Sequence, residues 1–200
     1  MRPVSDFIIK PSGGRYNNSV KVGDIDLILN TEIFNHQYTN RVGIIQKTPL
    51  YNPMGLSKGD EIVIHHNVFR RWHDIKGREK NSRSFLNEDE YLVSEDQIFM
   101  YKKENGWCSM PGYTFVKPIK SQDKYSLTPE RPLVGIVKYS DGSFLPTQLV
   151  GFKPSSEYEF TIDGDRLYRV MNNFITIEYE YQGNEEEYNP GWAESSRRVN

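Results

Sequence analysis

The sequence predicts an all-β fold made of two small β-barrels in tandem. Two observations lead to this prediction. The apolar runs are short, rich in β-branched and aromatic residues, and separated by Gly, Pro, Asn and Asp, and landmarks of the first half recur in the second half in the same order. Many short strands with turn residues between them are typical of barrels and sandwiches.

Nine stretches are predicted to be strands, and no stretch shows a sustained helical period. They are residues 7–10, 42–46, 61–66, 97–102, 114–117, 133–139, 158–162, 167–171 and 174–181. The final residues EYEY of the last stretch alternate charged and aromatic side chains, as expected for a strand with one face in water. The turn residues in IDGDR (162–166) predict a hairpin between the two strands that flank them.

Four landmarks of the first half recur in order, which predicts a tandem repeat. The pairs are FIIKP (7–11) with TFVKP (114–118), VGIIQ (42–46) with VGIVK (134–138), GLSKGDEIVI (55–64) with GFKPSSEYEF (151–160), and YLVSEDQI (91–98) with YRVMNNFI (168–175). The offsets differ, so the insertions fall between strands, where they are tolerated. The alternative is one continuous barrel whose strands have repetitive composition.

The repeat sets the predicted domain boundaries. Residues 1–102 form the first barrel, 103–112 a linker, 113–182 the second barrel and 183–200 a polar C-terminal tail. A chain of 200 residues suits two small domains as well as one large domain.

Composition excludes several classes of protein. With 13 Tyr and 10 Phe the chain is too aromatic to be disordered, and a single cysteine, Cys108, excludes an internal disulfide. The net charge of −2 gives no argument for nucleic acid, and the basic run 69–83 contains Asp74 and Glu79, so we interpret it as a solvated loop. No nucleic acid or membrane partner is expected, and a polar N-terminus unlike a signal peptide predicts a cytoplasmic location.

No catalytic site, metal site or cofactor is predicted. His65 and His66 are adjacent on a predicted strand, where they would point to opposite faces and could not share a metal ion. The motifs of nucleotide binding and of serine hydrolases do not occur in the sequence. We therefore expect that the protein is not an enzyme.

One apolar run lies between stretches that are typical of loops. The residues GDIDLILNTEIF (23–34) follow PSGGRYNNSVKV and precede NHQYTNRVG, both rich in polar and turn-forming residues. The apolar residues at its centre are Ile25, Leu27, Ile28 and Leu29. Two interpretations stand: a buried strand of the core, or an apolar binding segment carried on a flexible loop.

Five segments of the first half carry a resemblance to a known family. They are RPVSDFIIK (2–10), GDIDLILN (23–30), RVGIIQKTP (41–49), LSKGDEIVIHHN (56–67) and YLVSEDQIFMYK (91–102). Their order and spacing resemble the GroES family of co-chaperonins, and they cover most of residues 1–102. The second half resembles the same fold more faintly.

The resemblance implies a fold and a function. It implies two tandem GroES-like small β-barrels, a homo-oligomeric ring, and a lid that binds a GroEL-type chaperonin and assists protein folding. The apolar residues Ile25, Leu27, Ile28 and Leu29 would be the chaperonin-binding residues of a mobile loop. In the family, edge strands of neighbouring barrels pair, so residues 4–9 and 97–101 are expected at an edge of the first barrel.

The chain also departs from the family pattern. Phe7 stands where a basic residue is usual, residues 65–90 are longer and more basic, and KSQDKYSLTPERP (120–132) replaces the mobile loop in the second half without an apolar triplet. The departures indicate a diverged member and leave host and phage origin open. The alternative function is a structural or assembly protein, of viral or other origin, that keeps the fold and has lost chaperonin binding. A third hypothesis is a small-barrel nucleic-acid binder that uses residues 69–83 with Trp72.

Overall fold

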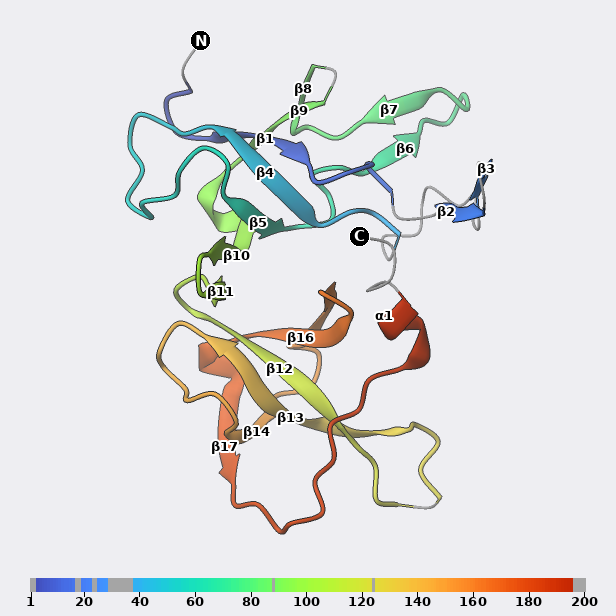
Figure 1. Ribbon diagram of the computed structural model, residues 1–200, viewed down its shortest axis with the longest axis vertical. Coiled ribbons are helices and arrows are strands. Elements are labelled where there is room, and N and C mark those ends of the chain that lie inside the picture. Colours follow the sequence, from blue (N-terminus) through green and yellow to red (C-terminus); the bar gives the residue numbers. More distant parts are fainter. Residues whose placement is uncertain are drawn as a thin grey trace. The chain divides into compact units, whose positions relative to one another are not determined.

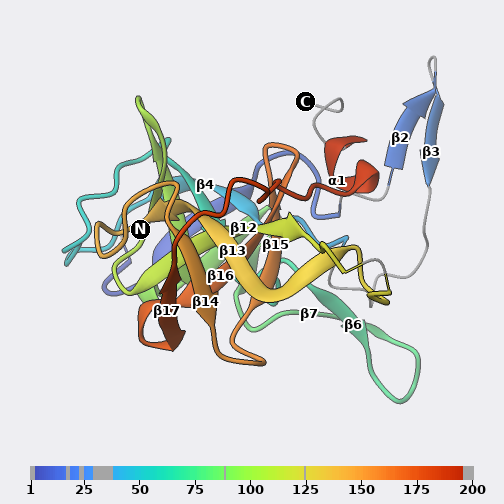
Figure 2. The same cartoon turned by 90° about the horizontal axis from the view of Figure 1, so that it is seen from below.

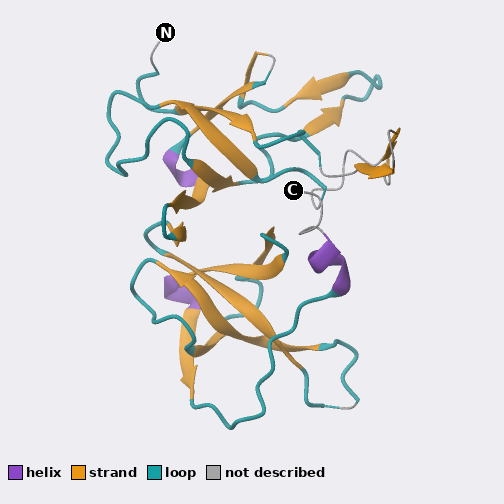
Figure 3. Ribbon diagram, in the orientation of Figure 1, coloured by secondary structure: helices purple, strands orange, loops and turns teal. Residues whose placement is uncertain are grey.

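The computed structural model describes residues 3–16, 19–22, 25–28, 38–87, 89–123 and 125–195. Nearly all regular structure in these residues is strand, which confirms the predicted all-β class (Figure 3). The chain divides into two compact units, Met1–Trp107 and Cys108–Asn200.

The first unit contains a seven-stranded sheet with the order β11-β10-β5-β4-β1-β9-β8 (Figure 1). Its strands are β1 (Phe7–Pro11), β4 (Val42–Lys47), β5 (Glu61–Ile64), β8 (Phe85–Asn87), β9 (Glu90–Val93), β10 (Ile98–Lys103) and β11 (Gly106–Ser109). Two further pairs form separate two-stranded sheets: β2 (Ser19–Val22) with β3 (Ile25–Ile28), and β6 (Arg71–His73) with β7 (Glu79–Asn81). A 3-10 helix, η1 (Glu95–Gln97), precedes β10.

The second unit contains a six-stranded sheet with the order β15-β16-β12-β13-β14-β17 (Figure 2). Its elements are β12 (Tyr113–Lys120), β13 (Glu130–Ser140), β14 (Leu149–Phe152), β15 (Tyr158–Ile162), β16 (Asp165–Met171), the 3-10 helix η2 (Asn172–Phe174), β17 (Ile175–Tyr179) and the short helix α1 (Gly191–Ser195). The predicted hairpin over 158–171 is confirmed by β15 and β16, which pair across the turn at Asp163 and Gly164.

The two sheets repeat the same topology. The order β8-β9-β1-β4-β5-β10 corresponds strand for strand to β15-β16-β12-β13-β14-β17, and a 3-10 helix precedes the last strand in each. The register repeats as well, because Pro11 pairs with Gly43 as Pro118 pairs with Gly135. Even the irregularities repeat: the register shifts between Ile8 and Ile9 in β1, and at the equivalent place in β12.

The structure corrects three details of the predicted architecture. Each sheet is open, with two end strands, and no closed barrel is found among the described residues. The counterpart of β5 is β14, so the predicted match of 55–64 with 151–160 is wrong. The two stretches resemble each other because both start with Gly and an apolar residue. Residues 7–9 and 98–101 are not at an edge, because β1 pairs with β4 and β9, and β10 lies between β5 and β11.

The predicted linker and tail contain ordered structure. The segment 103–112 includes strand β11, beside β10. Residues 186–188 of the predicted tail pair with the end of β12, through a bridge between Glu187 and Ile119 and a hydrogen bond from Tyr188 N–H to the Pro118 carbonyl at 2.8 Å. The polar composition had suggested a solvated tail. Instead, Glu187 of this segment forms an ion pair with buried Lys117 of the second unit at 2.7 Å.

Each unit has its own apolar core. Side chains that are 3% exposed or less include Phe7, Ile9, Ile45, Ile62, Ile64, Phe69, Tyr91, Val93, Ile98 and Met100 in the first unit, and Phe115, Val116, Val137, Leu149, Val150, Phe160, Leu167 and Val170 in the second. Most lie on the strands that the sequence predicted, because alternation of apolar and polar residues marks strands with one buried face.

Two equivalent glycines, Gly43 and Gly135, differ in how much room they leave for a side chain. A Cβ atom at Gly135 would lie 2.7 Å from the Lys117 carbonyl oxygen, whereas at Gly43 the nearest atom, also at 2.7 Å, is the movable end of the Ile9 side chain. We expect Gly135→Ala to lower the free energy of unfolding by about 1–3 kcal/mol. Gly43→Ala should cost less, and urea unfolding of both variants measures the difference. A larger loss for Gly43→Ala would contradict this account.

The hydrogen bonds to the Asp141 carboxylate make the stability of the second unit depend on pH. Burial raises the pKa of Asp141, but hydrogen bonds from Gly112 N–H at 2.6 Å, from Ser143 and from the Asn172 amide outweigh it and lower the pKa from 3.8 to about 2. The ionised carboxylate therefore stabilises the fold above about pH 4, and this contribution is lost as the pH falls through about 2.

We expect the melting temperature of Asp141→Asn to lie below that of the wild type at about pH 6, and the gap to shrink toward about pH 2. Thermal melts across this range measure the gap. Glu180→Gln, at an exposed carboxylate, is the control and should show no such change. A gap that is constant with pH would show that Asp141 does not act through its charge.

Candidate functional site

The connection between β1 and β4 is the candidate site, and its base is closed by backbone pairing. Tyr16 and Thr39 form an antiparallel bridge, Asn40 N–H donates to the Arg15 carbonyl at 2.9 Å, and Ser12 N–H donates to the Val42 carbonyl at 2.9 Å. The two ends of a long connection are thereby held side by side, where β1 ends and β4 begins.

Asn40 locks this base from inside. Its side chain is 3% exposed, and its amide nitrogen donates to the carbonyls of Ser12 and Gly14, each at 2.9 Å. Its amide oxygen accepts from Val42 N–H at 2.9 Å. Because a buried amide must use its hydrogen-bonding groups, these three bonds fix the entry and the exit of the connection relative to each other.

Arg15 ties the same base to the rest of the unit. Its guanidinium donates to the Phe69 carbonyl at 3.2 and 3.1 Å and to the Asn81 side chain on β7 at 3.0 Å. It also lies 5.3 Å from the centre of the Tyr91 ring, a cation–π arrangement. Burial lowers the pKa of Arg15, while nearby Tyr91 offsets part of that effect.

The β6–β7 pair contacts the base through Tyr16. The Tyr16 hydroxyl accepts from Arg71 N–H at 2.7 Å, and the Arg71 guanidinium lies 5.2 Å from the ring centre. Arg71 also forms an ion pair with Glu79 across the ribbon at 3.0 Å. The base of the connection is thus supported by the core, by β7 and by β6.

Three of the four predicted docking residues lie on strand β3. Leu27 pairs with Val20 and Ile25 pairs with Val22, so the apolar stretch forms one strand of the β2–β3 hairpin, which is separate from the seven-stranded sheet (Figures 1 and 2). Ile28 pairs with Ser19. Leu29 lies outside the described residues. The backbone of this stretch is therefore a strand, and the strand is not part of the main sheet.

The equivalent connection in the second unit, 121–129 between β12 and β13, is short and internally bonded. Tyr125 N–H donates to the Asp123 carboxylate at 2.9 Å, and the Ser126 hydroxyl donates to the Thr128 carbonyl at 2.8 Å. Tyr125 is 93% and Leu127 is 102% exposed. The repeat therefore differs most at the position where the first unit carries its apolar hairpin.

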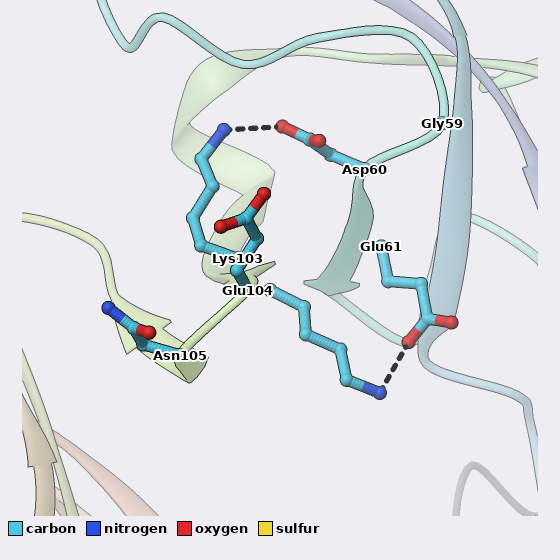
Figure 4. Close-up of a pocket in the computed structure, with 7 residues that line it drawn as sticks. Gly59, Asp60, Glu61, Lys103, Glu104 and Asn105 are labelled. Atoms are coloured by element: carbon cyan, nitrogen blue, oxygen red, sulfur yellow. Dashed lines mark hydrogen bonds and ion pairs between the residues drawn. The ribbon is translucent and has the colours of Figure 1, made fainter.

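A polar hollow of about 610 Å³ lies between β5 and β10 (Figure 4). Lys103 forms an ion pair with Asp60 at 2.8 Å, and Lys102 forms one with Glu61 at 3.2 Å. Each lysine is paired with a carboxylate, and Glu104, which also lines the hollow, leaves it with one net negative charge.

The histidines are arranged differently from the prediction. Strand β5 ends at Ile64, so His65 and His66 lie beyond it, and their rings stack with centres 4.4 Å apart instead of pointing to opposite faces. Within the described part of the chain, no group of three or more His, Cys, Asp or Glu side chains is placed to hold a metal ion.

Comparison with known proteins identifies no relative: no family model matches the chain, and no curated protein matches it. In the described residues, no helix has both the length and the apolar character needed to cross a membrane.

The sequence did not reveal the residues that hold the base. Arg15, Tyr16 and Asn40 are polar residues in stretches typical of loops, and their partners Phe69, Arg71 and Asn81 are far along the chain. The one local signal is Asn40 itself, two residues before the predicted strand at 42–46, because an asparagine next to a strand is typical of a residue that bonds nearby backbone.

We predict that Asn40 is essential to the base. Asn40→Ala removes the side-chain partner of two part-buried carbonyls and of one N–H, so the free energy of unfolding should fall by about 1–3 kcal/mol. Asn40→Asp keeps the acceptor for Val42 but removes both donors, so it should also destabilise. Urea unfolding measures both variants, with Asn105→Ala at an exposed turn as the control. Unchanged stability of both Asn40 variants would contradict the role of Asn40 in holding the base of the connection.

Proposed function

We propose that this chain is a co-chaperonin-like lid protein that binds a GroEL-type chaperonin through Ile25, Leu27, Ile28 and Leu29 and assists protein folding. The observation that supports it most is the connection between β1 and β4. Its base is clamped by Asn40, and it carries the apolar stretch on a hairpin separate from the main sheet. A segment fixed at its base and extending beyond the sheet is suited to reach a partner.

The proposal includes two GroES-like small barrels in one chain. Its support is the repeated strand order, with a 3-10 helix before the last strand of each unit. The repeated register shifts favour curled sheets, since bulges increase local twist. The proposed activity requires no catalytic residue and no cofactor.

The energetics of such a lid favour weak contacts used many times. Each fully buried apolar side chain contributes about 1.5–3 kcal/mol, and ordering the backbone costs about 1–2 kcal/mol per residue. The pairing of β3 with β2 reduces this cost, because part of the backbone order exists before docking. In a homo-oligomeric ring, many weak segments bind tightly together and still release when the partner changes state.

Ring assembly would use the open sheet edges. These are β8 and β11 in the first unit and β15 and β17 in the second. An exposed edge strand presents unpaired backbone groups that favour pairing with another chain. The ring contacts proposed here therefore differ from those expected from residues 4–9 and 97–101.

A double variant tests the docking segment. Changing Leu27 and Leu29 to Ser should abolish retention on an immobilised GroEL-type chaperonin in its nucleotide-bound state, because the apolar area for docking is lost. Thermal stability should change by less than about 1 kcal/mol, whereas core residues would cost about 2–5 kcal/mol each. Pull-down and a thermal melt of the same sample measure both quantities.

The matched control changes exposed apolar residues elsewhere. Tyr125→Ser with Leu127→Ser removes comparable apolar area from the second unit and should leave chaperonin binding intact. A large fall in melting temperature of the Leu27 and Leu29 variant would favour a structural role for the stretch. Failure of the wild-type protein to bind any chaperonin state would favour the structural or assembly function instead.

A further inference from the structure

The ribbon formed by β6 and β7 has one face that contacts the base of the candidate site and one face that is exposed to solvent. Arg71 and Asn81, which pair across the ribbon, contact Tyr16 and Arg15 at the base of the candidate site. Trp72 and Lys80 pair across the ribbon at the next position, and neighbouring residues of a strand point to opposite faces. Trp72 is 46% exposed, so this second face presents an aromatic ring to solvent.

The ribbon is strongly basic in an otherwise slightly acidic chain. Residues 70–83 contain six basic and two acidic residues, a net charge of +4 with His73 neutral, whereas the whole chain carries −2. The basic residues are Arg70, Arg71, Lys76, Arg78, Lys80 and Arg83. Lys76, Arg78 and Lys80 are exposed, and all three lie at or beyond the turn that follows Trp72.

The two carboxylates of the ribbon have structural partners. Asp74 accepts from the backbone N–H groups of Lys76 and Arg78 at 2.9 Å each, which shapes the turn, and Glu79 pairs with Arg71. Lys80 is 3.9 Å from Asp74 and its side chain is 48% exposed, so that contact is long. The exposed face therefore keeps most of its positive charge.

We propose that the exposed face of the β6–β7 ribbon binds single-stranded nucleic acid, with a base stacked on Trp72 and phosphates contacted by Lys76, Arg78 and Lys80. An aromatic ring beside several cations is the chemistry of single-strand binding, because each base has a flat face and each nucleotide a negative charge. The bases of a duplex are stacked on each other and would not reach Trp72.

A membrane surface fits the ribbon less well. Insertion into a lipid interface needs a broad apolar face, and on this ribbon fully exposed Ile75 stands alone at the turn, among charged residues. This inference departs from the expectation that the chain has no nucleic-acid partner. The sequence showed the charges of 69–83 without their register, and the register is what places Trp72 opposite Lys80 and separates Glu79 onto the other face.

The experiment uses the full chain and fluorescein-labelled oligo-dT and oligo-U of about 16 nucleotides. Fluorescence anisotropy at salt concentrations between about 50 and 200 mM should show binding that weakens as salt rises. Trp72→Ala should weaken binding by at least about fivefold, and Trp72→Phe, which keeps an aromatic ring, should retain most of it. Binding of either oligonucleotide supports the proposal.

A charge-matched pair of variants separates local contacts from overall charge. Changing Lys76, Arg78 and Lys80 to Gln should lower the slope of log affinity against log salt by about 2, because each lost phosphate contact contributes about 0.7. Changing Lys58, Lys138 and Lys153 to Gln removes the same charge elsewhere and should leave the slope unchanged.

Circular dichroism melts confirm that each variant is folded. The proposal is overturned if the wild-type protein binds neither oligonucleotide at about 50 mM salt. It is also overturned if both triple variants weaken binding equally, or if anionic phospholipid vesicles bind while the oligonucleotides do not. None of these outcomes depends on whether the chain binds a chaperonin.

Discussion

The close approach of β12 to β13 at Gly135 is the constraint on which the second unit depends. Any side chain there would meet the Lys117 carbonyl at 2.7 Å, so the two strands reach their observed spacing because position 135 is glycine. The first unit places Gly43 at the same point, opposite Pro11. The register fixed at this pair decides which residues of both strands face the core, since a shift by one residue would turn every side chain to the other face.

The same pair also determines where the variable connection begins. Pro11 and Pro118 lie near the ends of equivalent strands, while Gly43 lies near the start of β4 and Gly135 at the middle of the longer β13. Between them the first unit inserts residues 12–41 and the second unit only 121–129. A constant strand pair with a variable connection allows one unit to gain a function while the sheet stays the same.

Strands were predictable from the sequence where they form a clear apolar run. β1, β4, β5, β12, β13 and β16 lie within or around predicted stretches, because these runs are rich in β-branched and aromatic residues. The short strands β8, β11 and β14 were missed, since β8 and β11 contain only two apolar residues each and Gly interrupts β14. β14 reads LVGF, and its counterpart β5 reads EIVI, so their equivalence appears in the sheet and not in the letters.

The polar contacts could not be predicted, because they join residues that are distant in the sequence. Arg15 meets Phe69 and Asn81, and Lys117 meets Asp165 and Glu187. A local pattern shows that these residues are polar but not which partner they will have. This is why the predicted tail was interpreted as solvated, although Glu187 is needed to offset the burial of Lys117.

The two units use their equivalent lysines differently, and this separates their roles. Lys10 on β1 is exposed, whereas Lys117 on β12 is 8% exposed. Burial lowers the pKa of Lys117, but the ion pairs with Glu187 and Asp165 outweigh it, so the pKa is raised and the lysine stays charged. Arg166 adds a second network with Glu130 and Glu159. In the second unit, these ion pairs thus join the sheet to Glu187 of the C-terminal segment and to Glu130, which follows the short connection.

In the first unit the polar groups hold the base of a long connection instead. Closing a loop costs entropy that grows only slowly with its length, so the clamp at Asn40 serves mainly to set the position and direction of the segment. Tyr16 and Thr39 are paired at the start and the end of this connection. Because Arg15 and Tyr16 also contact β7 and β6, the ribbon and the connection share one support. The base of the connection thus joins two hairpins, β2–β3 and β6–β7, that lie outside the seven-stranded sheet and leave its strand pairing intact.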